Sequence, residues 1–285
     1  MIEKEVDVKT PDGVQDCDFF YPDEKGAWPA IILYTDIGGR RAVFREMGKR
    51  LASAGFAVLV PNHFYRAGRA PLYENFKFGD EKTTARMNEL RAFVTPAGAE
   101  KDAHALVDFL TRDKHVKGGI GTIGYCMGGG LAMRTAAAEP SKVTTVVSFH
   151  GSNLATDAAD SPHTLAPKIN ARLYFGFAIE DRTMPPEAVE KLKTALDKAG
   201  ANYEGEVYAG ARHGWCVKDH TVYHEHQAEH AWHHMLEVLK GGSGGHHHHY
   251  GASDADGAGI EFDVCHSGRV GRTCARANPR DDRLS

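Results

Sequence analysis

The chain has 285 residues, of which 42% are hydrophobic and 25% charged, and its formal net charge is −4. These values are typical of a globular protein with enough chain to bury a core. No apolar run approaches the ~18–20 residues that a membrane-spanning helix needs, and lysine and arginine are scattered rather than clustered. We therefore expect no membrane association and no nucleic-acid partner.

Cysteine usage and the first residues predict a cytoplasmic protein. The five cysteines are odd in number and have no repeating spacing, so they do not form a disulfide framework. Residues 1–5 include acidic side chains and lack the apolar stretch of a secretory signal peptide. We expect a monomer or a weak homo-oligomer in a reducing compartment.

The composition of the chain changes at Gly241. Residues 241–249 read Gly-Gly-Ser-Gly-Gly-His-His-His-His, a flexible linker followed by a histidine run. Residues 250–285 show no helical or strand periodicity and hold few apolar side chains. We expect residues 1–240 to form the folded domain, and residues 241–285 to be linker, histidine run and a disordered or tag-derived tail.

Apolar runs alternate with helical patterns along the first 240 residues. The run 30–34 predicts a buried strand that ends in the turn Asp36-Ile37-Gly38-Gly39, and a helix over 42–54 stops at Gly55. Further strands are predicted at 56–60, 119–123, 143–149, 173–177 and 203–208, and further helices over 98–110, 127–138, 186–199 and 220–240. This alternation indicates one α/β domain with a mostly parallel sheet covered by helices on both faces.

The stretch 124–128, Gly-Tyr-Cys-Met-Gly, lies between a predicted strand and a predicted helix. This G-x-C-x-G pattern is typical of a nucleophile elbow, in which the two glycines permit a tight turn. The turn would present Cys126 at a helix N-terminus, which favours the thiolate form. The backbone N–H of Met127 would then face an oxyanion on the substrate. The competing interpretation is a buried structural cysteine beside a glycine-rich packing turn.

A thiol nucleophile needs a base and an orienting acid. Asp181 follows the predicted strand 173–177, and His213 follows the predicted strand 203–208. Both lie past the carboxyl ends of strands, where ligands meet open α/β sheets. The order Cys126, Asp181, His213 is that of an α/β-hydrolase triad. Glu180 is the competing acid if the turn is shifted by one residue.

These motifs resemble the dienelactone hydrolase family of α/β-hydrolases over nearly all of residues 1–240. The resemblance is carried by 124–129 (Gly-Tyr-Cys-Met-Gly-Gly), by Glu180-Asp181, by 211–214 (Ala-Arg-His-Gly) and by 59–66 (Leu-Val-Pro-Asn-His-Phe-Tyr-Arg). It implies an α/β-hydrolase fold and a small-molecule substrate. It also implies hydrolysis of esters and lactones by a Cys-His-Asp triad, with no metal and no cofactor.

The resemblance implies two further site residues. Family members place an acid at the end of the first buried strand of this region, where it helps to deprotonate the thiol. That position is Asp36 here, whereas the best-known members carry glutamate, and the shorter side chain has less reach toward Cys126. The N–H of Ile37 would be the second oxyanion donor.

The substrate is less well defined by the resemblance. Members that cleave dienelactone hold its carboxylate with an arginine shortly after the catalytic histidine, and the matching stretch 215–218, Trp-Cys-Val-Lys, has none. A neutral or bulkier ester is therefore at least as plausible a substrate as dienelactone. The aromatic residues expected to line an apolar pocket are Phe64, Tyr65, Phe76 and Trp215, although several of them would equally pack loops onto the domain.

A rival motif lies in the last predicted helix. Residues 226–230, His-Gln-Ala-Glu-His, match the H-x-x-E-H pattern of inverted zinc peptidases. The apolar side chains of this helix fall on the face opposite His226 and His230, which predicts a solvated face and no metal site.

Two more hypotheses compete with the ester hydrolase. One is a non-catalytic binding protein on a hydrolase fold, in which the triad residues are present but do not align. The second is a promiscuous esterase or phosphotriesterase that uses the same triad. The residues of the triad are common to all of these hypotheses, so the sequence does not separate them.

Overall fold

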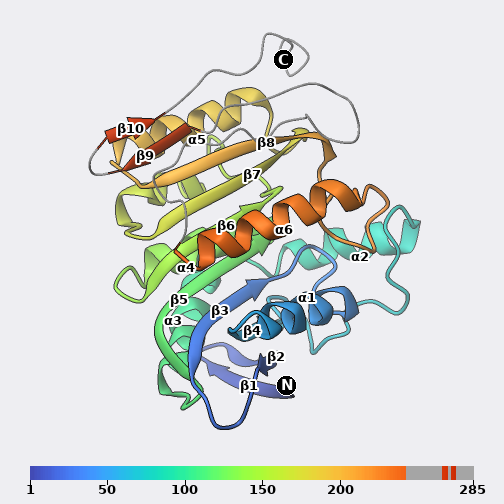
Figure 1. The fold of residues 1–285 in the computed structure, drawn as a ribbon. Coiled ribbons are helices and arrows are strands. Elements are labelled where there is room, and N and C mark those ends of the chain that lie inside the picture. Colours follow the sequence, from blue (N-terminus) through green and yellow to red (C-terminus); the bar gives the residue numbers. More distant parts are fainter. Residues whose placement is uncertain (242–264, 269–270, 274–285) are drawn as a thin grey trace.

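The computed structural model describes residues 1–241, 265–268 and 271–273. Their strands form one sheet in the order β1-β2-β4-β3-β5-β6-β7-β8-β9-β10, drawn in Figure 1. The strands β3 to β8 pair in parallel, whereas β1, β2, β9 and β10 pair antiparallel at the two edges. Their bounds are β1 (Ile2–Thr10), β2 (Gly13–Tyr21), β3 (Trp28–Tyr34), β4 (Ala57–Pro61), β5 (Val116–Tyr125), β6 (Val143–Phe149), β7 (Arg172–Glu180), β8 (Tyr203–Arg212), β9 (Cys265–Gly268) and β10 (Gly271–Thr273).

Helices cover both faces of this sheet. In Figure 1, α1 and α6 lie in front of it and α3, α4 and α5 behind it. Two separate clusters of buried apolar side chains fill the two sides. The predicted α/β fold with a mostly parallel sheet is therefore confirmed. The helix bounds are α1 (Ala42–Ser53), α2 (Glu81–Arg91), α3 (Pro96–Arg112), α4 (Met127–Ala138), the 3-10 helix η1 (Pro162–Lys168), α5 (Pro186–Lys198) and α6 (Glu225–Leu239).

Local signals explain where the helices begin and end. Helix α1 buries Phe44, Leu51 and Ala52 on one side and is followed by Gly55, whose φ is +102°. Helix α3 begins after Thr95, whose hydroxyl accepts a hydrogen bond from the Gly98 N–H at 3.1 Å. The Gly55 stop is the signal that the sequence analysis used for α1, whereas α3 begins at Pro96, two residues before its predicted start.

The last helix is shorter than predicted. It begins at Glu225 rather than at residue 220, because the ring of His224 accepts a hydrogen bond from the Gln227 N–H at 3.1 Å and caps the helix there. Hydrogen-bonded turns precede this cap, with the His220 N–H donating to the Val217 carbonyl at 3.0 Å. The interval 220–224 therefore belongs to the loop that follows β8.

Residues 241–285 lie mostly outside the described residues. The parts of this segment that are described are Gly241, β9 and β10, and β9 pairs antiparallel with β8. Within the described residues, no helix is both long and apolar enough to cross a membrane.

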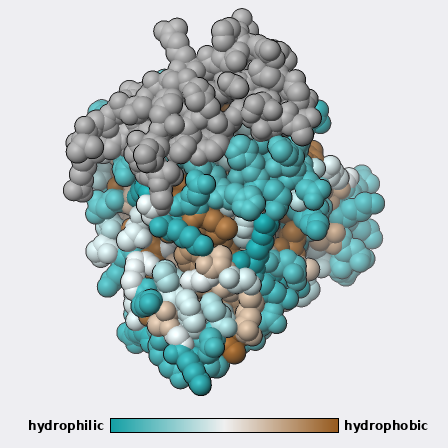
Figure 2. All heavy atoms as spheres, viewed as in Figure 1, coloured by the Kyte–Doolittle hydropathy of each residue, from teal (hydrophilic) through white to brown (hydrophobic). Residues whose placement is uncertain are grey.

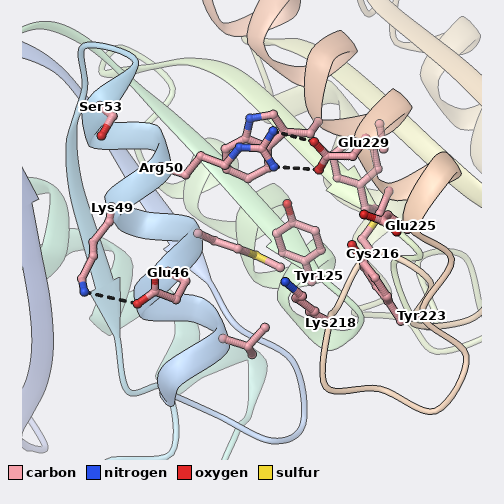
Figure 3. A pocket seen from close by; sticks show the side chains of 16 residues that line it. Glu46, Lys49, Arg50, Ser53, Tyr125, Cys216, Lys218, Tyr223, Glu225 and Glu229 are labelled. Carbon is pink, nitrogen blue, oxygen red and sulfur yellow. Dashed lines mark hydrogen bonds and ion pairs between the residues drawn. The ribbon is translucent and has the colours of Figure 1, made fainter.

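A groove of about 500 Å³ opens between α1 and α6 (Figure 3). Its lining includes the buried side chains of Tyr125 and Cys216, and at its rim Arg50 pairs with Glu229 at 2.7 Å. The guanidinium of Arg50 also lies over the Trp232 ring, 4.3 Å from its centre. The face seen in Figure 2 is mostly hydrophilic, with apolar side chains visible in smaller patches between the polar ones.

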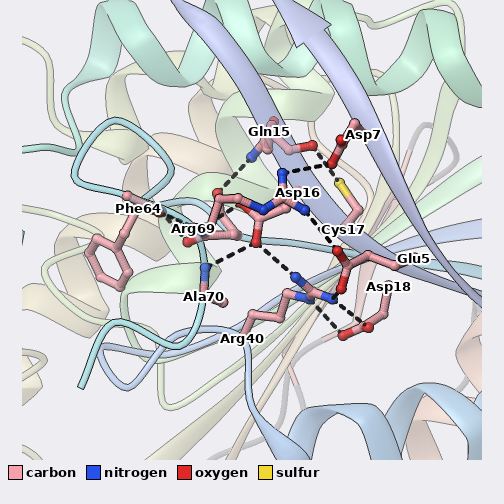
Figure 4. Close-up of polar contacts among 12 residues, drawn as sticks. Glu5, Asp7, Gln15, Asp16, Cys17, Asp18, Arg40, Phe64, Arg69 and Ala70 are labelled. Carbon is pink, nitrogen blue, oxygen red and sulfur yellow. Dashed lines mark hydrogen bonds and ion pairs between the residues drawn. The ribbon is translucent and has the colours of Figure 1, made fainter. Parts of the chain in front are cut away.

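A buried arginine ties the loop after β3 to the edge of the sheet (Figure 4). The side chain of Arg40 is 5% exposed and forms ion pairs with Glu5, Asp16 and Asp18 at 2.6, 2.7 and 2.8 Å. Asp16 also accepts a hydrogen bond from the Ala70 N–H at 3.1 Å. The guanidinium thus joins β1 and β2 to the loop after β3, and Asp16 in turn holds the loop that contains Ala70.

Candidate active site

Cys126 lies in a tight turn between β5 and α4. Its φ of 58° is in the left-handed region that side chains other than glycine rarely adopt. A Cβ atom on Gly124 would lie 1.9 Å from the Gly128 carbonyl oxygen, and one on Gly128 would lie 2.4 Å from the Thr35 carbonyl oxygen. Both positions therefore require glycine, as the elbow pattern predicts.

Three predicted site residues meet at this turn. The Cys126 Sγ lies 3.2 Å from His213 Nε2, and His213 Nδ1 lies 2.6 Å from Asp181 Oδ2. The other Asp181 oxygen accepts hydrogen bonds from the N–H and the hydroxyl of Thr183, at 2.9 and 2.7 Å. The Asp181 side chain is only 2% exposed, whereas that of His213 is 26% exposed.

The charge state of His213 follows from these contacts. Burial lowers the pKa of its imidazole, but the hydrogen bonds to Asp181 and Cys126 outweigh burial and raise the pKa to about 10. A pKa of about 10 favours the protonated imidazole at neutral pH.

Glu180, the competing acid, lies elsewhere. It is exposed and pairs with Arg212 at 3.4 Å, while Asp181 occupies the position next to His213. The structure therefore brings Asp181, and not its neighbour, to the imidazole.

The backbone N–H groups of Ile37 and Met127 are the predicted oxyanion donors. Met127 is the first residue of α4, and in the part of the chain that the structure describes neither N–H donates a hydrogen bond to the protein. The peptide after Ile37 is fixed because the Tyr73 hydroxyl donates to the Ile37 carbonyl at 2.6 Å. Both donors are thus available to a bound substrate.

A model of the dienelactone hydrolase family matches residues 18–242, more than half of the chain. The chain belongs to the dienelactone hydrolase family. A carboxymethylenebutenolidase of Rhodococcus opacus is 28% identical over 195 residues, which cover 67% of this chain and 72% of the relative. A Synechocystis sp. protein, provisionally named a carboxymethylenebutenolidase, is 27% identical over 219 residues, or 75% of this chain and 87% of the relative. The protein is therefore a hydrolase of this family.

Solved structures share its fold. A Klebsiella pneumoniae structure, provisionally named a dienelactone hydrolase, has a TM-score of 0.74 at 23% identity and covers 84% of this chain and 98% of its own. A dienelactone hydrolase-like promiscuous phosphotriesterase from metagenomic libraries has a TM-score of 0.69 at 19% identity, with the same coverage. At these identities the likeness establishes the fold alone.

Asp36, the acid that the family resemblance suggested for thiol activation, contacts a different group. Its two oxygens accept hydrogen bonds from Arg41 at 2.5 and 3.1 Å, and Arg41 also pairs with Asp219 at 2.8 Å. No hydrogen bond joins Asp36 to Cys126 among the residues of the described ranges. The Asp36 carboxylate instead stabilises the turn after β3, because it accepts a hydrogen bond from the Gly38 N–H at 2.9 Å.

Three of the four predicted pocket residues are buried in the protein. Phe64 and Trp215 have no exposed surface, and the Tyr65 hydroxyl contacts Thr10 and Asp102 at 2.6 and 2.7 Å. These three side chains pack within the fold. Phe76 is half-buried. Its ring lies against the Arg41 guanidinium and stays a pocket candidate.

One side chain at the site was missed by the sequence analysis. The Ser152 hydroxyl lies 3.3 Å from Cys126 Sγ and 3.4 Å from His213 Nε2. Ser152 follows β6 at the same carboxyl edge as the elbow, so its place after a predicted strand was an available signal. That position alone did not distinguish it from an ordinary loop serine.

The histidines of the rival zinc motif do not gather into a site. The His230 ring packs against Tyr208 with centroids 5.6 Å apart, and His226 is exposed. Within the described ranges, no group of three or more His, Cys, Asp or Glu side chains is placed to hold a metal ion.

Proposed function

We propose that the protein hydrolyses carboxylic esters or lactones, without a cofactor, through a thioester formed on Cys126. The observation that carries this proposal is the line of contacts from Cys126 Sγ to His213 Nε2 and from His213 Nδ1 to Asp181. Membership of the dienelactone hydrolase family supports it.

Acylation begins from a thiolate beside a protonated His213. The thiolate attacks the ester carbonyl carbon, a C–S bond forms, and the carbonyl electron pair moves to oxygen. The N–H groups of Ile37 and Met127 donate to that oxyanion. The intermediate then collapses, the C–O bond breaks, and the Nε2–H of His213 gives its proton to the departing alkoxide.

Deacylation reverses these roles. His213, now neutral, takes a proton from water, and the resulting hydroxide attacks the thioester carbonyl. The second oxyanion uses the same two N–H donors, and breaking the C–S bond releases the acid and restores the thiolate. Asp181 holds the imidazole in one orientation and stabilises its cationic form through both steps.

The charges near the site favour a neutral acyl group over an anionic one. Arg41 is the cation next to Asp36, and its guanidinium is already paired with Asp36 and Asp219. Lys218, the cation nearest in sequence after His213, lines the groove between α1 and α6. Neither is a free carboxylate receptor at Cys126.

Turnover assays test this proposal. We expect the wild type to hydrolyse p-nitrophenyl acetate and butyrate, and Cys126→Ala to lose the activity while its circular dichroism is unchanged. Cys216→Ala is the matched control, because this thiol is buried beside the groove between α1 and α6 and should leave turnover intact. Full activity in Cys126→Ala would contradict the proposal. A phosphate triester assayed in parallel distinguishes a phosphotriesterase that uses the same triad.

A further inference from the structure

The Ser152 hydroxyl contacts both atoms that react in the proposed mechanism. Its Oγ lies 3.3 Å from Cys126 Sγ and 3.4 Å from His213 Nε2. These two atoms are the only hydrogen-bond partners of this hydroxyl in the part of the chain that the structure describes. Within the described residues, the hydrogen bonds of this hydroxyl therefore go to the thiol and the imidazole and to no helix cap.

The backbone around Ser152 is tied directly to the elbow. The Cys126 N–H donates to the Phe149 carbonyl at 3.2 Å, and the Ser152 N–H donates back to the Cys126 carbonyl at 3.0 Å. Two reciprocal hydrogen bonds thus hold the turn after β6 against the nucleophile. The position of the hydroxyl beside the sulfur follows from this pairing.

The same turn is also anchored to the strand and the loop that carry the acid. The His150 N–H donates to the Gly176 carbonyl of β7 at 2.9 Å, and the Asn153 N–H donates to the Thr183 carbonyl at 3.2 Å. His150 and Asn153 both have positive φ, 38° and 51°. Non-glycine residues keep such conformations only where their surroundings over-determine them, and they cluster at functional sites.

We propose that Ser152 is a further catalytic residue, which donates a hydrogen bond from its hydroxyl to the Cys126 thiolate. This inference rests on the proposed function, in which that thiolate is both the attacking and the leaving group. With the Nε2–H of His213, the hydroxyl gives the sulfur two donors when it is charged. No bond to Ser152 forms or breaks, and its proton stays on Oγ throughout.

Two consequences follow for the reaction. In the free enzyme the hydroxyl increases the fraction of Cys126 present as thiolate, since hydrogen bonds to a charged form favour that form. In deacylation it stabilises the thiolate as it leaves the tetrahedral intermediate. Its effect on acylation, measured as kcat/KM, should therefore be largest at low pH and shrink where the thiol is fully ionised without help.

The pH dependence of thiol alkylation tests the proposal. Iodoacetamide would be added to the whole protein between pH 4 and 10, and mass spectrometry of the peptide that contains Cys126 would give the rate at that thiol alone. Burial raises the pKa of the Cys17 and Cys216 thiols, and following only the peptide that contains Cys126 excludes any signal from them. In Ser152→Ala we expect the midpoint of the profile to move up by about one pH unit.

Two further variants control for packing. Ser148→Ala is matched, because this serine lies on β6, four residues earlier, and its buried hydroxyl has no partner in the described structure. It should keep the wild-type midpoint. Ser152→Thr retains a hydroxyl and should also keep it. An unchanged midpoint in Ser152→Ala, or an equal shift in Ser152→Thr, would overturn the proposal.

The alkylation result is independent of the ester assay. A wild type that shows no Cys126-dependent ester hydrolysis would contradict the proposed function, yet the shift in Ser152→Ala would still be measurable. If both hold, Ser152→Ala should lower kcat/KM for p-nitrophenyl acetate about tenfold below the wild-type midpoint. The deficit should shrink above the midpoint of the variant, which a purely structural defect would not produce.

Discussion

The carboxylate of Asp181 is held on both sides. One oxygen accepts two hydrogen bonds from Thr183, and the other faces His213 Nδ1 at 2.6 Å. The carboxylate is buried, whereas the imidazole is about a quarter exposed and keeps access to solvent. In the proposed mechanism, Asp181 therefore fixes the charge and orientation of His213, while His213 exchanges protons with substrate and water.

Removing the Asp181 charge should shift the alkaline limit of activity. Burial lowers the pKa of His213, but hydrogen bonds to Asp181 and Cys126 raise it to about 10. The imidazolium that protonates the alkoxide is therefore kept until pH approaches 10. In Asp181→Asn the pKa of His213 should fall, so kcat/KM should decline at least one pH unit earlier. We also expect a loss of about 10³-fold at neutral pH.

The neighbouring carboxylate supplies the control for this experiment. Glu180→Gln removes an exposed charge that pairs with Arg212, and its pH profile should match that of the wild type. If kcat/KM declined at the same alkaline pH in Asp181→Asn and in the wild type, Asp181 would not set the charge of His213.

The raised pKa of His213 also predicts a contribution to the free energy of unfolding. This stabilising contribution is complete below pH 6.5 and is lost as pH rises toward 10.

At the scale of elements, the loop between β3 and α1 connects the sheet edge to the site. Arg40 points into the cluster of Glu5, Asp16 and Asp18, and the next residue, Arg41, points to Asp36. Two successive arginines thus anchor opposite sides of the loop that carries Ile37. We therefore expect the position of the Ile37 N–H, the proposed oxyanion donor, to depend on both anchors.

Replacing Arg40 should destabilise the fold strongly. In Arg40→Met the carboxylates of Asp16 and Asp18 lose the buried guanidinium that neutralises them, and a buried charge without its partner costs about 3–5 kcal/mol. Urea unfolding at pH 7 measures the loss. Arg69→Met is the matched control, because Arg69 pairs with Glu5 and Asp7 from an exposed position. Equal losses in the two variants would contradict this account.

The strands and helices that could be predicted from the sequence are those with a strong apolar pattern. The central strands β3 to β8 read as apolar runs because they are buried on both faces. The edge strand β1 was missed because it is exposed along most of its length and its charged residues hide any alternation. Helix α2 was missed because it buries only three residues, Thr83, Met87 and Leu90.

For the molecule as a whole, the parallel sheet explains why three distant segments meet. The loops after β5, β7 and β8 leave the same edge, so Cys126, Asp181 and His213 could be associated from strand order alone. The ion pair between Arg41 and Asp219 could not be predicted, because 178 residues separate the two side chains and no local spacing relates them. The contact of Ser152 with the thiol likewise depends on the turn after β6, which no motif describes.

Buried neutral histidines should make the whole fold sensitive to acid. Burial lowers the pKa of His63 to about 3 and that of His150 well below its usual value. Unfolded histidine binds a proton near pH 6.5, so unfolding takes up protons and the free energy of unfolding falls as pH drops below about 6.5. Between pH 7 and 4.5, His63→Leu should lose about 2 kcal/mol less than the wild type.

Urea unfolding of both proteins at the two pH values checks this prediction. His63 suits the test because it packs against Phe64, with ring centroids 4.3 Å apart, and has no role in the proposed reaction. Identical losses between pH 7 and 4.5 in the variant and the wild type would show that other groups cause the acid sensitivity.

The most direct test of the mechanism is to trap the acyl group on the protein. The wild type would be mixed with p-nitrophenyl acetate, quenched with acid within the first turnovers, and digested for mass spectrometry. We predict one acetyl group on the peptide that contains Cys126, absent from Cys126→Ala and persisting longer in His213→Ala if any forms there. Acetylation at another residue that tracks turnover, with Cys126 unmodified, would contradict the assignment of Cys126 as the nucleophile.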